Sequence, residues 1–341
     1  MDTVEFLLSN ACPSIVYRTK QEILMEHLSS REIEYYQRLI LESDKVRSIL
    51  RWQGNDGYFG SRLHTASTGS KIWTHEGCVR YLIEKGILIN NNVLKKSLLA
   101  LLEPGWEKEI ENSRAASIFG KDIIRAALFA QAGLYDYDFV ELWIKKSLQA
   151  FQHIAETPSF HELVTIDECG KYVFREKTYI PTIYHIRMLA YTYSWRNTNS
   201  EDMVMLALKK LYDWLPLPPV YYKSKSQFIA PLMNVAWPIN CSINEKNCFW
   251  WLHSYELMAR MGMLKKTSPF RICFDEINFA DVVNQLKITK QWFNTRYKKK
   301  TYLIWSGYSG LALEDDWNNV DNQMYDLVFR YCLIHYYCNK D

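Results

Sequence analysis

A repeated helix–turn–helix unit is the feature that most constrains the fold of this 341-residue chain. Apolar residues recur at three- and four-residue spacing, as in Ile123, Ala126, Ala127 and Ala130, which is the period of an amphipathic helix. The unit is an apolar helix that ends at a glycine, then a polar turn and a second helix rich in Lys and Leu. Alternating strand patterns are scarce, so the sequence predicts a fold of helical hairpins.

Three copies of this unit are clear in the sequence, and two more can be recognised. The first runs from Trp73 to Gly86 and continues in VLKKSLLALL, and the second runs from Lys121 to Gly133 and continues in VELWIKKSLQAF. The third spans Ile180 to Tyr193 and continues in DMVMLALKKLYDWL. The last two begin near Asn247 and near Asn319. The spacing of the first two glycines accommodates two helices with their turns.

We expect the hairpins to form one all-α domain over residues 1–341, an α/α toroid of about five hairpins with a helical lead-in at residues 1–45. Repeat-built folds grow by adding units, so the length does not require two domains. A short β-hairpin is expected within residues 159–177, because β-favouring runs flank the turn at Gly170. The proline-rich stretch 216–219 and the residues that follow it are expected to form a surface loop.

Composition and charge exclude several classes of protein. The net charge is +3, and Lys298, Lys299 and Lys300 form the only tight basic run, so we expect no nucleic-acid partner. No window reaches the roughly 18 apolar residues that a membrane-spanning helix needs. None of the eight cysteines forms a CxxC pair, and the start MDTVEFLL lacks the pattern of a secretion signal. The expected location is the cytoplasm, with free thiols.

Aromatic residues make up 15% of the chain, and many lie near the predicted helix starts. Packing between helices accounts for most aromatic residues in any helical protein. Their clustering near helix starts also fits the wall of a large cavity.

The segment LRWQGNDGYFG, from Leu50 to Gly60, contains Gln53, Asp56 and Tyr58. It resembles the Gln-x-x-x-Asp-Gly-x-aromatic-Gly turn of the terpenoid cyclase and protein prenyltransferase superfamily of α/α toroids. The lead-in CPSIVYRTKQEIL is similar to that of bacterial prenyltransferase or squalene-cyclase repeat proteins. The Asp-Gly pair favours a tight turn and the aromatic residue can hold it between helices, so we expect a structural role for this segment.

The catalytic signatures of that superfamily are not matched. Class II cyclases use an Asp-x-Asp-Asp acid, and the closest runs here, Asp167-Glu168-Cys169 and Glu314-Asp315-Asp316-Trp317, do not match it. Protein prenyltransferases bind zinc through an Asp-x-Cys pair and a later His, so Asp167 and Cys169 are weak candidate metal ligands, with His185 or His253 as the third. No cofactor is identified by the sequence, and zinc and magnesium remain open.

In such a toroid the N-terminal ends of the inner helices face one mouth of the cavity, and residues just inside those ends are the natural site residues. The candidate catalytic residues are Asp315, Asp316, His75, Glu76 and His253. The candidate substrate-binding residues are Trp73, Tyr184, His185, Trp250, Trp251, Trp317 and Tyr325. Carboxylates near helix starts also cap helices, and each of these histidines can equally be a hydrogen-bonded core residue.

Three functions follow from these patterns. The first is a terpenoid-cyclase-like or prenyltransferase-like enzyme that acts on an isoprenoid or other small apolar substrate in an aromatic-lined central cavity, where ring faces stabilise a developing cation. The second is a non-catalytic helical-repeat protein that binds a ligand or a protein partner. The third is a carbohydrate-active toroid enzyme with paired carboxylates. The sequence identifies neither the substrate nor the oligomeric state.

Overall fold

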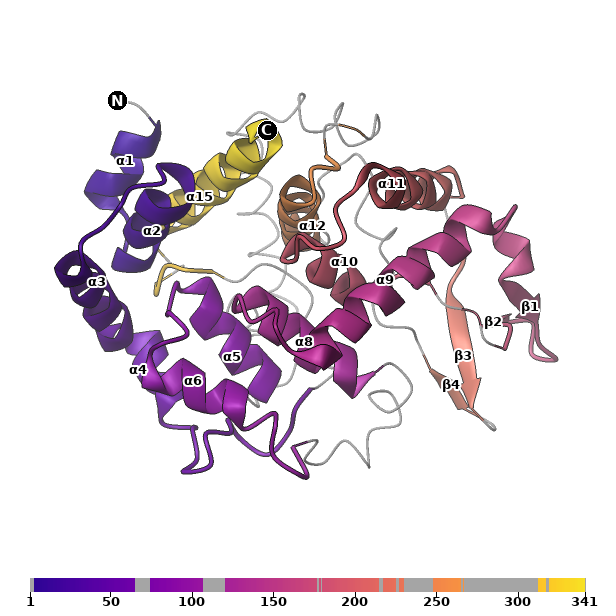
Figure 1. Ribbon diagram of the computed structural model, residues 1–341, viewed down its shortest axis with the longest axis horizontal. Helices are drawn as coiled ribbons and strands as arrows, with labels where there is room; N and C mark the ends of the chain where they lie inside the picture. Colours follow the sequence, from indigo (N-terminus) through magenta and orange to yellow (C-terminus); the bar gives the residue numbers. More distant parts are fainter. Residues whose placement is uncertain are drawn as a thin grey trace.

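The computed structural model describes residues 3–64, 74–106, 120–176, 178, 180–214, 217–224, 227–229, 248–264, 266, 312–316 and 319–340. Helices dominate this part of the chain, and Figure 1 shows them packed side by side. None of the helices described there is both long and apolar enough to cross a membrane.

The two ends of the chain lie beside one another. The N-terminal elements are α1 (Thr3–Asn10), α2 (Pro13–Arg18), the π-helix η1 (Thr19–Ile23), α3 (Ser30–Glu42) and α4 (Asp44–Leu50). The first three of them pack against the last helix, α15 (Val320–Asn339) (Figure 1). Local sequence explains two of the helix starts, because Pro13 occupies the first turn of α2 and Ser29 with Glu32 forms a capping box on α3.

Between these ends the helices occur in pairs, at the positions that the repeat indicates. The pairs are α5 (His75–Glu84) with α6 (Asn92–Leu99), α8 (Lys121–Gln131) with α9 (Asp138–Glu156), and α10 (Ile183–Ala190) with α11 (Thr198–Asp213); α12 (Cys248–Arg260) follows. The first helices of the pairs are neighbours in the order α5, α8, α10, α12, and α15 comes next. Gly86 and Gly133 have positive φ angles just after α5 and α8, as expected of glycine at a helix end.

The prediction of an all-α toroid is wrong, because the mostly helical chain also contains a four-stranded mixed sheet. After the short helix η3 (Phe160–Glu162) come β1 (Val164–Ile166) and β2 (Tyr172–Phe174), which form the expected hairpin, and β3 (Val220–Ser224) and β4 (Gln227–Ile229) extend it in the order β1-β2-β3-β4. In Figure 1 the sheet lies to one side of the helices, beyond the end of α9.

The pairing that completes the sheet joins segments far apart in the sequence. Strand β3 runs parallel to β2, with Tyr172 opposite Val220, and antiparallel to β4. The sequence VYYKS of β3 is rich in residues that favour strands, and the prolines before it stop the preceding helix. The stretch after Pro219 is therefore a strand pair where a loop was expected.

The turn between Leu50 and Gly60 has the structural role that its sequence indicates. Asp56 Oδ1 accepts a hydrogen bond from the Tyr58 N–H at 3.0 Å, and Gln53 Nε2 donates to the carbonyl of Val93 at 3.0 Å. The Tyr58 ring is buried and stacks on the ring of His75, with 4.0 Å between the centroids. The turn is thereby fixed against the pair α5 and α6.

Gly57 provides a test of how tightly this turn is held. Its φ angle is +84°, and a Cβ atom built there would lie 2.4 Å from the carbonyl oxygen of Lys96. We expect Gly57→Ala to lower the free energy of unfolding by about 2 kcal/mol or more, because backbone strain and a backbone clash add together.

The measurement is urea unfolding followed by circular dichroism, with Gly105→Ala as the matched control. Gly105 also has a positive φ angle, +74°, but its Cβ would meet nothing within 4 Å. Equal losses of stability in the two variants would show that the contact with Lys96 contributes nothing.

Candidate functional site

Three of the predicted site residues meet inside the molecule. Tyr184 of α10 donates a hydrogen bond from its hydroxyl to Glu76 Oε1 of α5 at 2.7 Å, and Arg187 lies 3.8 Å from the same oxygen. Arg187 also donates from Nε to His253 Nε2 of α12 at 3.3 Å. All four side chains are buried. Helices α5, α10 and α12 therefore share one polar cluster.

Three members of this cluster were not predicted from the sequence. His64 is hydrogen-bonded to Glu76 Oε2, Arg80 lies 3.3 Å from His253 Nε2, and Arg187 joins the two halves. Burial and the positive charges of Arg80 and Arg187 lower the pKa of His253, which stays neutral and accepts hydrogen bonds at Nε2. Burial alone raises the pKa of Glu76, but His64 and Arg187 outweigh it, and the pKa is lowered.

Three other predicted residues have structural contacts. His75 accepts the N–H of Phe59 at Nδ1 and contacts the carbonyl of Ser97 through Nε2, at 2.9 and 3.0 Å. His185 Nδ1 accepts the N–H of Thr182 at the start of α10, and burial lowers its pKa to about 4. Tyr325 packs against Phe6 of α1.

The predicted acids and metal ligands do not converge. Asp315 forms an ion pair of 2.8 Å with the buried Lys85, and Asp316 is exposed. Asp167 accepts the N–H groups of Cys169 and Lys171 in the turn between β1 and β2. Within the described ranges, no three His, Cys, Asp or Glu side chains are grouped as a metal site.

The remaining predicted residues cannot be placed. Trp73 and Trp317 lie outside the described residues, as do the side chains of Trp250 and Trp251.

The polar cluster continues into an ionic network around Glu84, the last residue of α5. Glu84 Oε2 lies 3.0 Å from Arg330 of α15 and 3.4 Å from Arg18 of α2, and Glu84 Oε1 accepts Gln131 Nε2 of α8 at 3.2 Å. Arg80 connects this network to His253, because its Nη2 lies 3.9 Å from Glu84 Oε1. Four helices thus meet at one buried carboxylate.

A second set of ion pairs joins α12 to the N-terminal elements. Arg260 lies 3.0 Å from Glu22 of η1 and 3.0 Å from Glu256, and Glu256 lies 2.7 Å from Arg330. Arg260 also donates to the Tyr337 hydroxyl at 2.7 Å. Arg18 pairs with Glu22 as well. Each buried charge in this set has at least one opposite charge beside it, as buried charges require.

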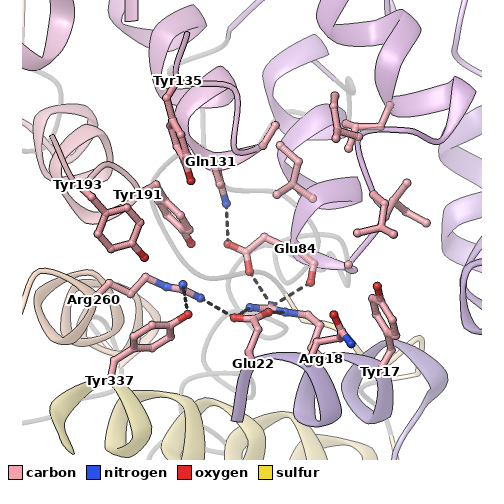
Figure 2. Close-up of a pocket in the computed structure, with 18 residues that line it drawn as sticks. Tyr17, Arg18, Glu22, Glu84, Gln131, Tyr135, Tyr191, Tyr193, Arg260 and Tyr337 are labelled. Carbon is pink, nitrogen blue, oxygen red and sulfur yellow. Dashed lines mark hydrogen bonds and ion pairs between the residues drawn. The ribbon is translucent and has the colours of Figure 1, made fainter. Parts of the chain in front are cut away.

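A pocket of about 410 Å³ opens above this network (Figure 2). Its floor is formed by Arg18, Glu22, Glu84 and Arg260. The rest of the lining is mostly aliphatic residues and tyrosines. The aliphatic residues are Ile83, Ile87, Leu88, Ile89 and Leu94, and the tyrosines are Tyr17, Tyr135, Tyr191, Tyr193 and Tyr337.

The pocket lies at the C-terminal ends of the helices. Glu84, Gln131 and Arg260 are the last residues of α5, α8 and α12, and Tyr191 follows directly after α10. The site was predicted at the opposite ends of these helices, and none of the predicted site residues lines this pocket. One signal was present in the sequence: Tyr135 follows the glycine that ends one predicted inner helix, and Tyr191 and Tyr193 lie at the end of the next.

The π-helix η1 supplies the pocket with residues from the N-terminal segment. Gln21 and Glu22 lie within it and Arg18 precedes it, and all three line the pocket. A π-helical turn changes the direction of successive side chains and is frequent at functional sites. Met25, shortly after η1, has a positive φ of 53°, which is unusual for a residue other than glycine.

The carboxylates and tyrosines of the pocket do not titrate near neutral pH. Burial raises the pKa of Glu22, but Arg18 and Arg260 outweigh it and lower the pKa to about 2. Burial also raises the pKa of Glu84, but the positive charges of Arg330 and Arg18 outweigh burial and lower that pKa to about 2. Burial raises the tyrosine pKa values at Tyr17, Tyr135, Tyr191 and Tyr337, so these hydroxyls stay protonated.

No protein family model, curated protein or solved structure matches this chain. Its function must therefore be argued from the geometry of its own residues.

The ion pairs of the floor predict how stability depends on pH. The pKa values of Glu22 and Glu84 are about 2, below the ordinary 4.5, so their stabilisation is complete above pH 4.5 and is lost as the pH falls toward 2. Each carboxylate contributes at most about 3 kcal/mol. We expect the free energy of unfolding to fall steeply below pH 4.5.

Urea unfolding at several pH values between 7 and 3 measures this slope, in the native protein and in Glu22→Gln. The variant should be less stable at pH 7 and should lose less stability on acidification. Glu103→Gln, at an exposed position outside the pocket, is the control. If the free energy of unfolding falls with pH as steeply in Glu22→Gln as in the native protein, the ion pairs of Glu22 are not a cause of the pH dependence.

Proposed function

We propose that this protein is a binding protein for a small, neutral, hydroxyl-rich ligand of the carbohydrate type, which occupies the pocket above Glu22 and Glu84. The observation that carries the proposal is the unused hydrogen-bonding capacity of the tyrosine wall. Among the described residues, the hydroxyls of Tyr17, Tyr135, Tyr191 and Tyr193 make no hydrogen bond. Each can both donate and accept, as sugar hydroxyls do.

The balance of charge supports a neutral ligand. Arg18 forms ion pairs with Glu22 and Glu84, and Arg260 forms one with Glu22, so the charges of these four side chains sum to zero. Glu22 is the most accessible of them, with 25% of its side chain exposed, against 1% for Glu84. A hydroxyl that donates to ionised Glu22 adds a hydrogen bond without adding a charge, and bonds to charged groups are the stronger kind.

The lining of the pocket supports a ligand that has both polar and apolar surface. Tyr17 lies on the other side of the pocket from Tyr191 and Tyr193 (Figure 2). Ile87 and Leu94 are among the aliphatic residues that line the pocket. A sugar ring presents C–H groups on its faces and hydroxyls at its edge, so it can contact the aliphatic and aromatic side chains while its hydroxyls reach the floor.

An isoprenoid substrate suits this pocket less well. An apolar chain would remove water from the tyrosine hydroxyls and from Glu22 without replacing its hydrogen bonds, which costs about 1–3 kcal/mol for each group left unsatisfied. The cyclase-like or prenyltransferase-like function predicted from the turn at Gln53 to Gly60 remains a prediction.

Sugar cleavage in this pocket also lacks support. Glycoside hydrolysis normally requires a carboxylic acid with a raised pKa to protonate the leaving oxygen. Glu22 and Glu84 have lowered pKa values and are held ionised by arginines. Binding without bond cleavage is therefore the function that the pocket supports best.

The test is isothermal titration calorimetry against a panel of neutral monosaccharides and disaccharides, with a sugar acid and an amino sugar for comparison. We expect at least one neutral sugar to bind more tightly than its charged analogues. Tyr17→Phe and Tyr191→Phe should each weaken that binding about fivefold, because each removes one hydrogen bond worth about 1 kcal/mol.

Tyr35→Phe is the matched control, because Tyr35 is half exposed and does not line the pocket. It should bind as the native protein does. If no neutral saccharide binds, or if charged analogues bind better, the proposal is wrong.

A further inference from the structure

Two tyrosine rings at the rim of the pocket are only partly covered by the protein. Tyr193 is 58% exposed and Tyr135 is 43% exposed, although both line the pocket. They follow α10 and α8, and Figure 2 shows both on the same side of the pocket.

The Tyr193 ring is held in place despite its exposure. The Arg196 guanidinium stacks on it at 4.4 Å from the centroid, and Arg196 Nη2 donates to the carbonyl of Arg260 at 2.8 Å. Arg260 in turn belongs to the floor network. The ring is therefore a fixed apolar surface at the rim of the pocket and is connected to the floor, which lowers the entropy cost of stacking a ligand on it.

The pocket is nearly closed at its floor, where Glu22 is the most accessible side chain, and it is most open at the rim, because Tyr135 and Tyr193 are the exposed residues of its lining. The side chains of Arg18, Glu84 and Arg260 are 6%, 1% and 8% exposed and are locked in ion pairs. A ligand can therefore be buried at one end, and a longer ligand can continue past Tyr135 and Tyr193.

We propose that the natural ligand is an oligosaccharide, whose terminal unit enters the pocket while the next unit stacks on the rim formed by Tyr135 and Tyr193. This inference rests on the proposed function and specifies its ligand. Recognition of a chain end follows from the closed floor, and recognition of more than one unit follows from the fixed, exposed rings. Aromatic rings offer the C–H face of a sugar apolar area without requiring any charge.

The experiment compares neutral oligosaccharides of one to four units in glucose-, galactose-, mannose- and xylose-based series, by calorimetry on the full chain. In the series that binds, affinity should rise about fivefold from one unit to two, which corresponds to about 1 kcal/mol and to about 40 Å² of covered ring. Further units should add little. In Tyr193→Ala and in Tyr135→Ala, the ratio of two-unit to one-unit affinity should fall toward one.

Tyr35→Ala, at an exposed tyrosine away from the pocket, should keep the native ratio. If one and two units bind equally, the ligand is a monosaccharide: the rim inference is wrong and the proposed function stands. If affinity rises with length but neither Tyr193→Ala nor Tyr135→Ala lowers the ratio of two-unit to one-unit affinity, the second unit does not stack on these rings and the inference is wrong. If no saccharide of any length binds, both the inference and the proposed function are wrong.

Discussion

The contact between Glu84 and its arginines determines how the helices of this protein meet. Glu84 ends α5, Arg18 ends α2, and Arg330 comes from the middle of α15, so one buried carboxylate joins both ends of the chain to the first helical pair. Burying such charges costs several kcal/mol per ion, and only close pairing compensates for it. Arg18 and Glu84 of these ion pairs also form part of the polar floor of the pocket.

The pocket follows from this arrangement. Because α5, α8 and α12 end at the network, their last residues and the segments that follow them converge on one side of the molecule. Tyrosines there give each segment an apolar ring to pack and a hydroxyl to solvate. Arg260 shows how floor and wall are joined, because it pairs with Glu22 and stacks on the rings of Tyr191 and Tyr337, at 4.7 and 4.3 Å.

Local patterns in the sequence predicted the helices, and long-range contacts account for what they missed. The period of apolar residues and the glycines at helix ends located the pairs, and the run around Gly170 located the first strand pair. The pairing of β2 with β3 was missed, because it joins residues that are distant in sequence. Arg80 and Glu84 were missed for a different reason: an i, i+4 charge pair looks the same on an exposed helix face as in a buried network. Glu76, Tyr184 and His253 were found as polar residues near helix starts, but the tyrosines after the helix ends were not considered.

The central claim is that a neutral sugar unit lies between the tyrosine wall and Glu22. A crystal structure of the protein soaked with the tightest-binding saccharide tests it most directly. We expect the terminal sugar ring in the pocket, with one hydroxyl within hydrogen-bond distance of Glu22 and others at Tyr17 and Tyr191. A sugar bound elsewhere, or a pocket filled by an apolar or charged molecule that was carried through purification, would contradict the account.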